Sequence, residues 1–232
     1  MEPQPAQYLV AMCDVLGFQN LVAALPLPEI HSRYLQLIQT LEPNPVYRVD
    51  TKTGRREVVL NHVVFSDTIL YWAPAGQAME LLPYTLAATM AASLDYLPFR
   101  AGIAFGECVI DPTRHIYIGQ PIIDAYHTEQ AHEWMGGAFH PSCWRYSGLL
   151  EVLCTEQTRS AVEYPVPIKP AAAAKGLRLE YGLNWPRGGD VNFRARAPEL
   201  LARALAAAPD NVKAKWENAQ RFFEAIFPDS RD

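Results

Sequence analysis

The segment Tyr8–Phe18, with the sequence YLVAMCDVLGF, constrains the fold of this chain more than any other. Its apolar run Tyr8–Cys13 is typical of a β-strand that is covered on both faces. Asp14 follows the run, and Gly17 then allows a tight turn into a helix. The segment therefore predicts a buried strand that ends at a carboxylate, beside a turn whose backbone N–H groups can bind an anion.

A second aspartate, Asp67, lies between two runs rich in strand-forming residues, Glu57–Phe65 and Thr68–Trp72. This short gap predicts a hairpin, although Ser-Asp is not the Asn-Gly or Asp-Gly pair that tight hairpins prefer. Taken singly, an aspartate at a turn or before a helix is most often a turn or capping residue. Taken together, Asp14 and Asp67 predict a site for a divalent cation and a polyphosphate, because Mg²⁺ binds one or two carboxylates plus phosphate oxygens.

The composition argues against several classes of protein. The net charge of −5 and the absence of a basic run disfavour a nucleic-acid-binding surface, which needs clustered lysine and arginine. The four cysteines are widely spaced, which indicates a reducing compartment rather than a disulfide-stabilised secreted protein. The N-terminus lacks the features of a signal peptide, and no apolar run approaches the roughly 20 residues of a membrane helix. We therefore expect a soluble, cytoplasmic protein that binds neither nucleic acid nor membrane.

Strand-like and helix-like segments alternate in a pattern typical of an α+β fold, with helices packed on one face of a mostly antiparallel sheet. We expect one domain over residues 1–190, a C-terminal helical appendage over 191–232, and a loop or mobile flap at 42–56. The expected helices are Phe18–Ala24, Pro28–Leu41, Gly76–Leu97, Gly119 to about Met135, Pro198–Ala208 and Asn211–Phe227. The expected later strands are a pair within Phe99–Asp111 bent at Gly106, then His115–Ile118, Gly137–His140, Tyr164–Lys169 and Leu177–Leu183.

Five motifs follow one another in the order found in class III nucleotidyl cyclases. DVLGF at 14–18 resembles the D-x-x-G-F signature of that family, and FSDT at 65–68 stands where the family has its second metal-binding aspartate. The later matches are RAGIAFGE at 100–107, YIGQPIIDAYHTEQ at 117–130, and VPIK at 166–169 followed by GLRLEYGL at 176–183. The resemblance spans about residues 8–183 and implies a ferredoxin-like cyclase catalytic domain.

The resemblance also implies an activity and a set of site residues. In this family the 3′-hydroxyl of a nucleoside triphosphate attacks the α-phosphorus and pyrophosphate leaves, at sites formed across a homodimer interface. Two Mg²⁺ or Mn²⁺ ions assist the reaction. The implied residues are Asp14, Val15 and Asp67 as metal ligands, Val15, Leu16, Gly17 and Phe18 as the triphosphate-binding turn, and Arg100 and Lys169 as phosphate contacts.

Several positions depart from the family pattern. The lysine that reads adenine in purine cyclases is replaced by Val63, and the position of that family's base-reading aspartate falls near Ile116. The helix asparagine and arginine that support the ribose and the transition state are replaced by Ile123 and His127. These departures leave three options: an inactive cyclase-like domain, a cyclase that takes its arginine from elsewhere, or a cyclase that selects another base.

A closer resemblance favours the last option. The pattern G-x-P-I-I-x-A-Y-x-x-E-Q at 119–130, GLNWP at 182–186 and the chain length resemble the pyrimidine cyclases of bacterial Pycsar antiphage systems. Those enzymes make cyclic UMP or cyclic CMP, which activates a separate effector protein. The resemblance therefore implies a pyrimidine cyclase, with UTP favoured over CTP.

The residues that read the base are open at this point. Asn61 offers both a donor and an acceptor to a pyrimidine edge, but a hydrogen bond within its strand explains it equally well. Tyr126 is either a stacking partner or a core residue, and Tyr47 and Arg48 are further candidates on the flap. His127 either replaces the missing transition-state arginine as a catalytic cation or pairs locally on an exposed helix face.

Two competing functions remain beside the cyclase. A degenerate domain of the same fold would bind a nucleotide as a sensor without turning it over, but it would not need both aspartates. A polymerase-like palm domain also pairs two aspartates on a sheet. The latter would need a basic template groove, which this composition does not supply.

Overall fold

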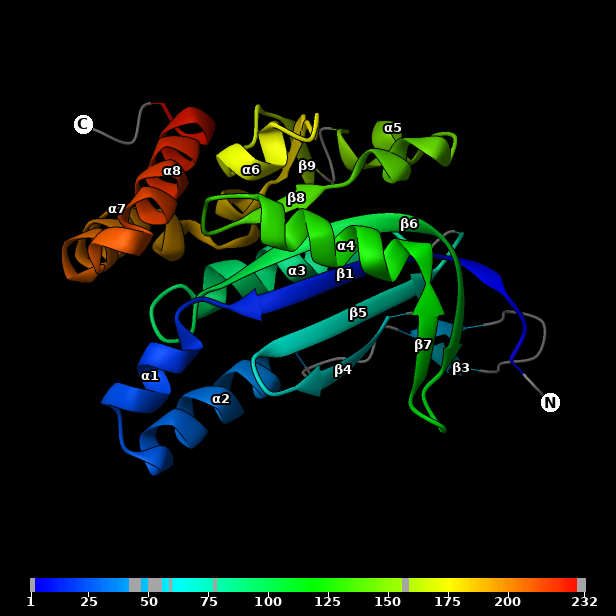
Figure 1. The fold of residues 1–232 in the computed structure, drawn as a ribbon, viewed down its shortest axis with the longest axis horizontal. Coiled ribbons are helices and arrows are strands. Elements are labelled where there is room, and N and C mark those ends of the chain that lie inside the picture. Colours follow the sequence, from blue (N-terminus) through cyan, green and yellow to red (C-terminus); the bar gives the residue numbers. More distant parts are fainter. Residues whose placement is uncertain are drawn as a thin grey trace.

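The computed structural model describes residues 3–41, 47–49, 56–58, 60–76, 79–155 and 159–228. Within these residues one large sheet carries helices on both of its faces (Figure 1). This confirms the α+β prediction but corrects the expectation that the helices lie on one face, because α3 (Leu81–Ser93) and α4 (Gln120–Ala131) cover opposite faces of the sheet. Its strands lie in the order β4 (Asn61–Phe65), β5 (Thr68–Pro74), β1 (Ala6–Val15), β6 (Phe99–Asp111), β8 (Gly137–Phe139), β10 (Tyr181–Leu183) and β9 (Ala161–Glu163), and β7 (Ile116–Gly119) also pairs with β6. All pairs are antiparallel except β6 with β8.

Strand β1 is covered on both faces, as its apolar sequence predicts. Leu9, Ala11 and Cys13 face a core that includes α3 (Leu81–Ser93), whereas Val10 belongs to a second cluster that includes α4 (Gln120–Ala131). Figure 1 shows α3 behind β1 and α4 in front of it. Because side chains alternate along a strand, Asp14 shares the α4 side of the sheet with Val10.

The remaining helices flank this sandwich. They are α1 (Phe18–Ala24), α2 (Leu27–Leu41), α5 (Leu149–Leu153), α6 (Pro170–Ala173), α7 (Val191–Ala207) and α8 (Asp210–Ile226), with 3₁₀ turns at Pro141–Arg145 and Trp185–Gly188. Helices α7 and α8 lie together at one end of the molecule (Figure 1). None of the helices in the described ranges is long and apolar enough to cross a membrane.

Several predicted boundaries are wrong. Phe99–Asp111 forms one continuous strand rather than a bent pair. Gly106 has a φ of +154° and sits inside this strand, where a Cβ would approach the Pro121 ring to 2.9 Å. Helix α4 ends at Ala131 rather than near Met135, because the next residue adopts an extended conformation. Helix α3 begins at Leu81, and residues 77–78 of the predicted helix lie outside the described ranges.

The predicted late hairpin is shorter than expected. Tyr164 N donates to Glu180 O and Val166 N to Leu179 O, but regular strands occur only at β9 and β10. Pro165 lies between the two donors and cannot donate to a ladder itself, which explains why the predicted strand Tyr164–Lys169 does not form.

The predicted flap is partly strand. Of residues 42–56, the structure describes only 47–49 and 56, and these belong to a two-stranded ribbon of β2 (Tyr47–Val49) and β3 (Arg56–Val58). The side chains of Tyr47 and Arg48, which were candidate base contacts, lie outside the described part of the structure.

The first C-terminal helix begins at Val191, not at Pro198. Asp190 caps it, since its Oδ1 accepts a hydrogen bond of 2.7 Å from Phe193 N. Phe193 and Ala197 are buried, so packing stabilises the early turns despite the proline inside the helix. Proline in a helix interior removes one backbone hydrogen bond, and here the cap and the buried face outweigh that loss.

Candidate active site

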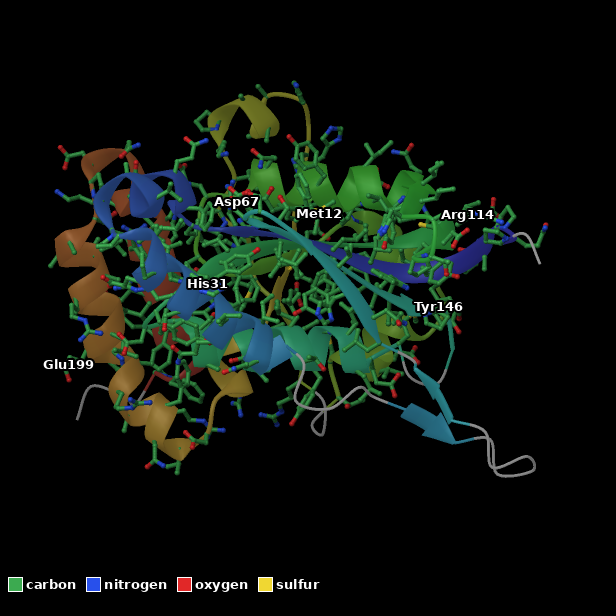
Figure 2. All side chains as sticks on the ribbon, turned by 90° about the horizontal axis from the view of Figure 1, so that it is seen from below. Met12, His31, Asp67, Arg114, Tyr146 and Glu199 are labelled. Atoms are coloured by element: carbon green, nitrogen blue, oxygen red, sulfur yellow. The ribbon has the colours of Figure 1, made fainter. Side chains whose placement is uncertain are left out.

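The two aspartates of the sequence analysis meet at one end of the sheet. Asp14 pairs in register with Thr68, the residue that follows Asp67, and Val15 N donates a 3.0 Å hydrogen bond to Asp67 O. Figure 2 shows Asp67 where β4 and β5 join, far from Arg114 at the opposite end of the sheet. Burial raises the pKa of Asp14, the Arg100 guanidinium lowers it, and the charge of Asp67 raises it further. The carboxylates are therefore close enough to repel each other.

The hairpin tip is held in an unusual conformation. Ser66 has a φ of +55°, which few residues other than glycine adopt. The hydroxyl of Tyr34 on α2 donates to Ser66 O and ties the tip to that helix. The tip that carries Asp67 is thus fixed by tertiary contacts rather than by a preferred turn sequence.

The predicted triphosphate-binding turn is only partly free. Val15 N is bonded to Asp67 O, and Leu16 N donates to Pro98 O at 2.9 Å. Gly17, with a φ of +70°, and Phe18 have no backbone acceptor for their N–H groups among the described residues. Two of the four predicted N–H groups therefore remain available to a ligand.

Arg100 lies between two carboxylates. It sits opposite Asp14 in the β1–β6 register, and its Nη2 and Nε lie 3.2 and 3.3 Å from Asp14 Oδ2. Its Nε also lies 2.5 Å from Oε1 of Glu129 on α4. The arginine is only 5% exposed, and its Nη1 has no hydrogen-bond partner among the described residues. Arg100 therefore holds the metal-ligand candidate Asp14 in place, and its predicted phosphate contact stays a prediction.

Glu129 is a site residue that the sequence analysis missed. It is 1% exposed on the face of α4 that packs on the sheet, together with Ala125 and Thr128. Burial raises its pKa to about 7, although the guanidinium of Arg100 opposes that shift. The spacing of these buried positions on α4 was the available signal, since it places a carboxylate on a face that otherwise contacts the sheet.

Two lysines complete the charged cluster. The Nζ of Lys169 donates a 2.7 Å hydrogen bond to Gln130 O at the end of α4. Lys215, on α8, interacts electrostatically with Asp14 and Glu129, and burial together with the charge of Arg100 lowers the pKa of both lysines. Lys169 was predicted, whereas Lys215 was not, because nothing local distinguishes it from other lysines of an amphipathic helix.

The described candidate base-reading residues lie on two elements, Asn61 on β4 and both Tyr126 and His127 on α4. Asn61 pairs with Trp72 in the β4–β5 register, and Val63 packs in the apolar cluster on the α4 side of the sheet. Tyr126 is 48% exposed, so it is not the core residue that one of the two interpretations expected. His127 is also exposed, and its ring lies 5.7 Å from that of Tyr126.

His127 does not form a local pair with Asp124, which was one of the two interpretations of this histidine. Asp124 accepts instead from Gln120 Nε2 at 2.8 Å, and its other oxygen lies 3.6 Å from His140 Nδ1. Within the described residues, no contact joins His127 to Asp14 or Asp67. A catalytic role for His127 at this site therefore stays a prediction.

The donor set fits a hard divalent cation. Among the described residues no group of three or more His, Cys, Asp or Glu side chains is placed to hold a metal. Asp14 and Asp67 offer two carboxylates, with the Val15 backbone beside them, and Mg²⁺ needs no more than one or two carboxylates when phosphate oxygens and water complete its shell. A zinc site of histidine and cysteine ligands would not fit here.

Solved structures with similar folds are nucleotide cyclases. The catalytic core of a rhodopsin-guanylyl cyclase with converted specificity, in complex with ATPαS, aligns with a TM-score of 0.50 and 11% identity over 78% of this chain and 96% of that chain. This chain has the class III cyclase fold. The guanylyl cyclase Cya2 aligns with a TM-score of 0.48 and 15% identity, over 79% of this chain and 94% of that chain. A comparison with protein-family models finds no match, and neither does a comparison with curated proteins.

Proposed function

We propose that this protein is a metal-dependent nucleotide cyclase that converts a pyrimidine nucleoside triphosphate, UTP rather than CTP, to its 3′,5′-cyclic monophosphate and pyrophosphate. The observation that carries the proposal is the meeting of Asp14 and Asp67 at one end of neighbouring strands. We further propose that the product is a second messenger in antiphage defence and acts on a separate effector protein. That part rests on the sequence resemblance alone.

The chemistry follows from the charges around the aspartates. The 3′-hydroxyl oxygen forms a bond to the α-phosphorus, the bond to the oxygen bridging the α- and β-phosphorus breaks, pyrophosphate leaves and the hydroxyl proton passes to solvent. A divalent ion held by Asp14 and Asp67 would neutralise phosphate charge and lower the pKa of the attacking hydroxyl. Arg100 orients Asp14 and favours its ionised form, since its charge opposes the rise in the pKa of Asp14 that burial causes, and Lys169 adds positive charge near the end of α4. The protein thus contributes mainly position and electrostatic stabilisation.

Two features support a pyrimidine substrate. Val63 is apolar where purine cyclases have a lysine, and it packs with Leu70 rather than presenting a charge. Asn61 lies two residues earlier, which places it on the same side of β4 as Val63. An amide donor and acceptor beside an apolar wall suits the edge of a uracil or cytosine ring.

Exposed apolar side chains support a homodimer with sites at the interface. Phe65, Ile118, Ile123 and Tyr126 are 82, 65, 49 and 48% exposed on β4, β7 and α4. We propose that these exposed apolar side chains contribute to the dimer interface. A second copy over this side of the sheet would also bring another His127 toward the carboxylates.

The test is to incubate the protein with each of the four nucleoside triphosphates and Mn²⁺ and to separate the products by chromatography. We expect cyclic UMP from UTP, a loss of at least a hundredfold in Asp67→Asn, and no change in Asp210→Asn, whose side chain is 94% exposed on α8. Turnover of purines only would refute the pyrimidine assignment.

A second candidate is an inactive nucleotide sensor with the same fold. The observation that favours it is the engagement of Asp14 by Arg100, in a chain that has Ile123 and His127 where cyclases have asparagine and arginine. Tight binding of a nucleotide without turnover of any triphosphate would support the sensor over the enzyme.

A further inference from the structure

Helix α8 is docked firmly beside the charged cluster. Met135 N donates to Lys215 O at 3.2 Å, and Asn218 Nδ2 donates to Glu133 O at 2.7 Å. One turn further on, the Phe222 ring packs edge-on against Trp134, with ring centroids 4.6 Å apart. Backbone and core contacts therefore set the position of Lys215.

The short segment after α4 brings three cations together. Lys169 N donates to Ala131 O at 2.8 Å, at the start of this segment. Ala101 N, next to Arg100, donates to Gly136 O at 3.0 Å, at its end. Lys215 accepts from the same segment through its backbone carbonyl. Arg100, Lys169 and Lys215 thus come from distant parts of the sequence and gather around one segment.

Lys215 also shares a cavity with the turn that follows β1. A cavity of about 520 Å³ is lined by Leu16, Gly17 and Lys215, by apolar side chains that include those of α1, α7 and α8, and by the charged side chains of Arg33, Asp95 and Arg203. This volume is in the usual range for a small-molecule site. Gly17 contributes one of the two N–H groups of the turn that have no acceptor, so the lysine and a free donor line the same space.

The charge of Lys215 is not neutralised by a close partner. It is half-buried, and no carboxylate of the described residues lies within ion-pair distance of its Nζ. Asp14 and Glu129 attract it at longer range, whereas Arg100 and Lys169 repel it. A half-buried ammonium group without a close counter-ion is unfavourable unless an anion joins it.

We propose that Lys215 binds the β- and γ-phosphates of the substrate, so that the C-terminal helix α8 completes the triphosphate site. This inference rests on the proposed function, which supplies the triphosphate. It assigns α8 a direct part in substrate binding, beyond packing on the domain. The terminal phosphates would lie between Lys215, the N–H of Gly17 and the ion held by the two aspartates.

The test compares Lys215→Gln with Lys213→Gln. Lys213 lies on the same helix, pairs with the exposed Asp210 at 2.7 Å, and serves as the matched control. Isothermal titration with a non-hydrolysable UTP analogue and with UMP, in the presence of Mn²⁺, measures the two affinities. For Lys215→Gln we expect the analogue to bind about tenfold more weakly or worse, the loss typical of one hydrogen bond to a charged group. UMP affinity should stay within about twofold, Lys215→Arg should restore most of the analogue binding, and Lys213→Gln should change neither affinity.

The outcomes separate this inference from the proposed function. If the wild type makes cyclic product and Lys215→Gln binds the analogue as the wild type does, Lys215 is not a phosphate ligand and the inference is wrong. An equal loss of analogue and UMP binding, with no rescue by Lys215→Arg, would assign the lysine a structural role and also overturn it. If the wild type neither binds nor converts any triphosphate, the proposed function itself fails.

Discussion

Glu129 allows a quantitative test of the electrostatics at this site. Its carboxyl group is 1% exposed and lies 2.5 Å from Arg100, so burial and ion pairing act in opposite directions. Arg100 also pairs with Asp14, and the effect of burial on the pKa of Glu129 is larger than the opposing effect of Arg100. The pKa of Glu129 consequently rises from 4.5 to about 7. A pKa shift of this size corresponds to about 3 kcal/mol of free energy between the protonated and ionised forms of the carboxyl group.

The direction in which Glu129 changes the stability with pH follows from proton linkage. Between about pH 4.5 and pH 7 the folded protein holds a proton on Glu129 that the unfolded chain releases. The contribution of this group to stability is therefore fully present below pH 4.5 and is lost as the pH rises through 7. Glu129→Gln mimics the protonated side chain at every pH. We expect the free energy of unfolding of the variant to exceed that of the wild type by about 1 kcal/mol near pH 5 and by about 3 kcal/mol at pH 8.

Urea unfolding of the wild type and the variant at several pH values between 5 and 8 measures the difference in their free energies of unfolding. Contributions that other titrating groups make to both proteins cancel in this difference. Glu217→Gln, on the exposed side of α8, is the control and should show no pH-dependent difference. The reasoning would be refuted if Glu129→Gln were less stable than the wild type at pH 8. That result would mean that the ionised Glu129–Arg100 pair stabilises the fold.

Two further predictions concern the scaffold that positions the site. Asp190→Ala removes the cap that Phe193 N uses, and urea unfolding should show a loss of about 1 kcal/mol; an unchanged midpoint would contradict the role of the cap. Gly102→Ala would place a Cβ 2.0 Å from Ala125 O, so α4 must move away from β6. We expect a loss of about 1–3 kcal/mol and weaker nucleotide binding, and a variant with unchanged thermal stability would show that α4 packs less tightly than described.

The local elements of the site could be predicted because their signals lie within a few residues. The apolar run before Asp14 and the glycine after it specify the strand, the turn and helix α1, and the latter has the predicted bounds Phe18–Ala24. The hairpin around Asp67 follows from two strand-forming runs and a two-residue gap. Where prolines interrupt such a signal, as in the predicted strand Tyr164–Lys169, the prediction is wrong.

By itself, then, the sequence determined that two carboxylates lie at the ends of strand-forming runs and that a glycine turn follows the first. The tertiary structure alone decided which charges surround them. Arg100 and Asp14 are 86 positions apart, and Lys215 reaches the cluster only because α8 docks on the segment after α4. Periodicity and turn chemistry act over a few residues, whereas the pairing of buried charges depends on strand register and helix docking, which no local pattern encodes.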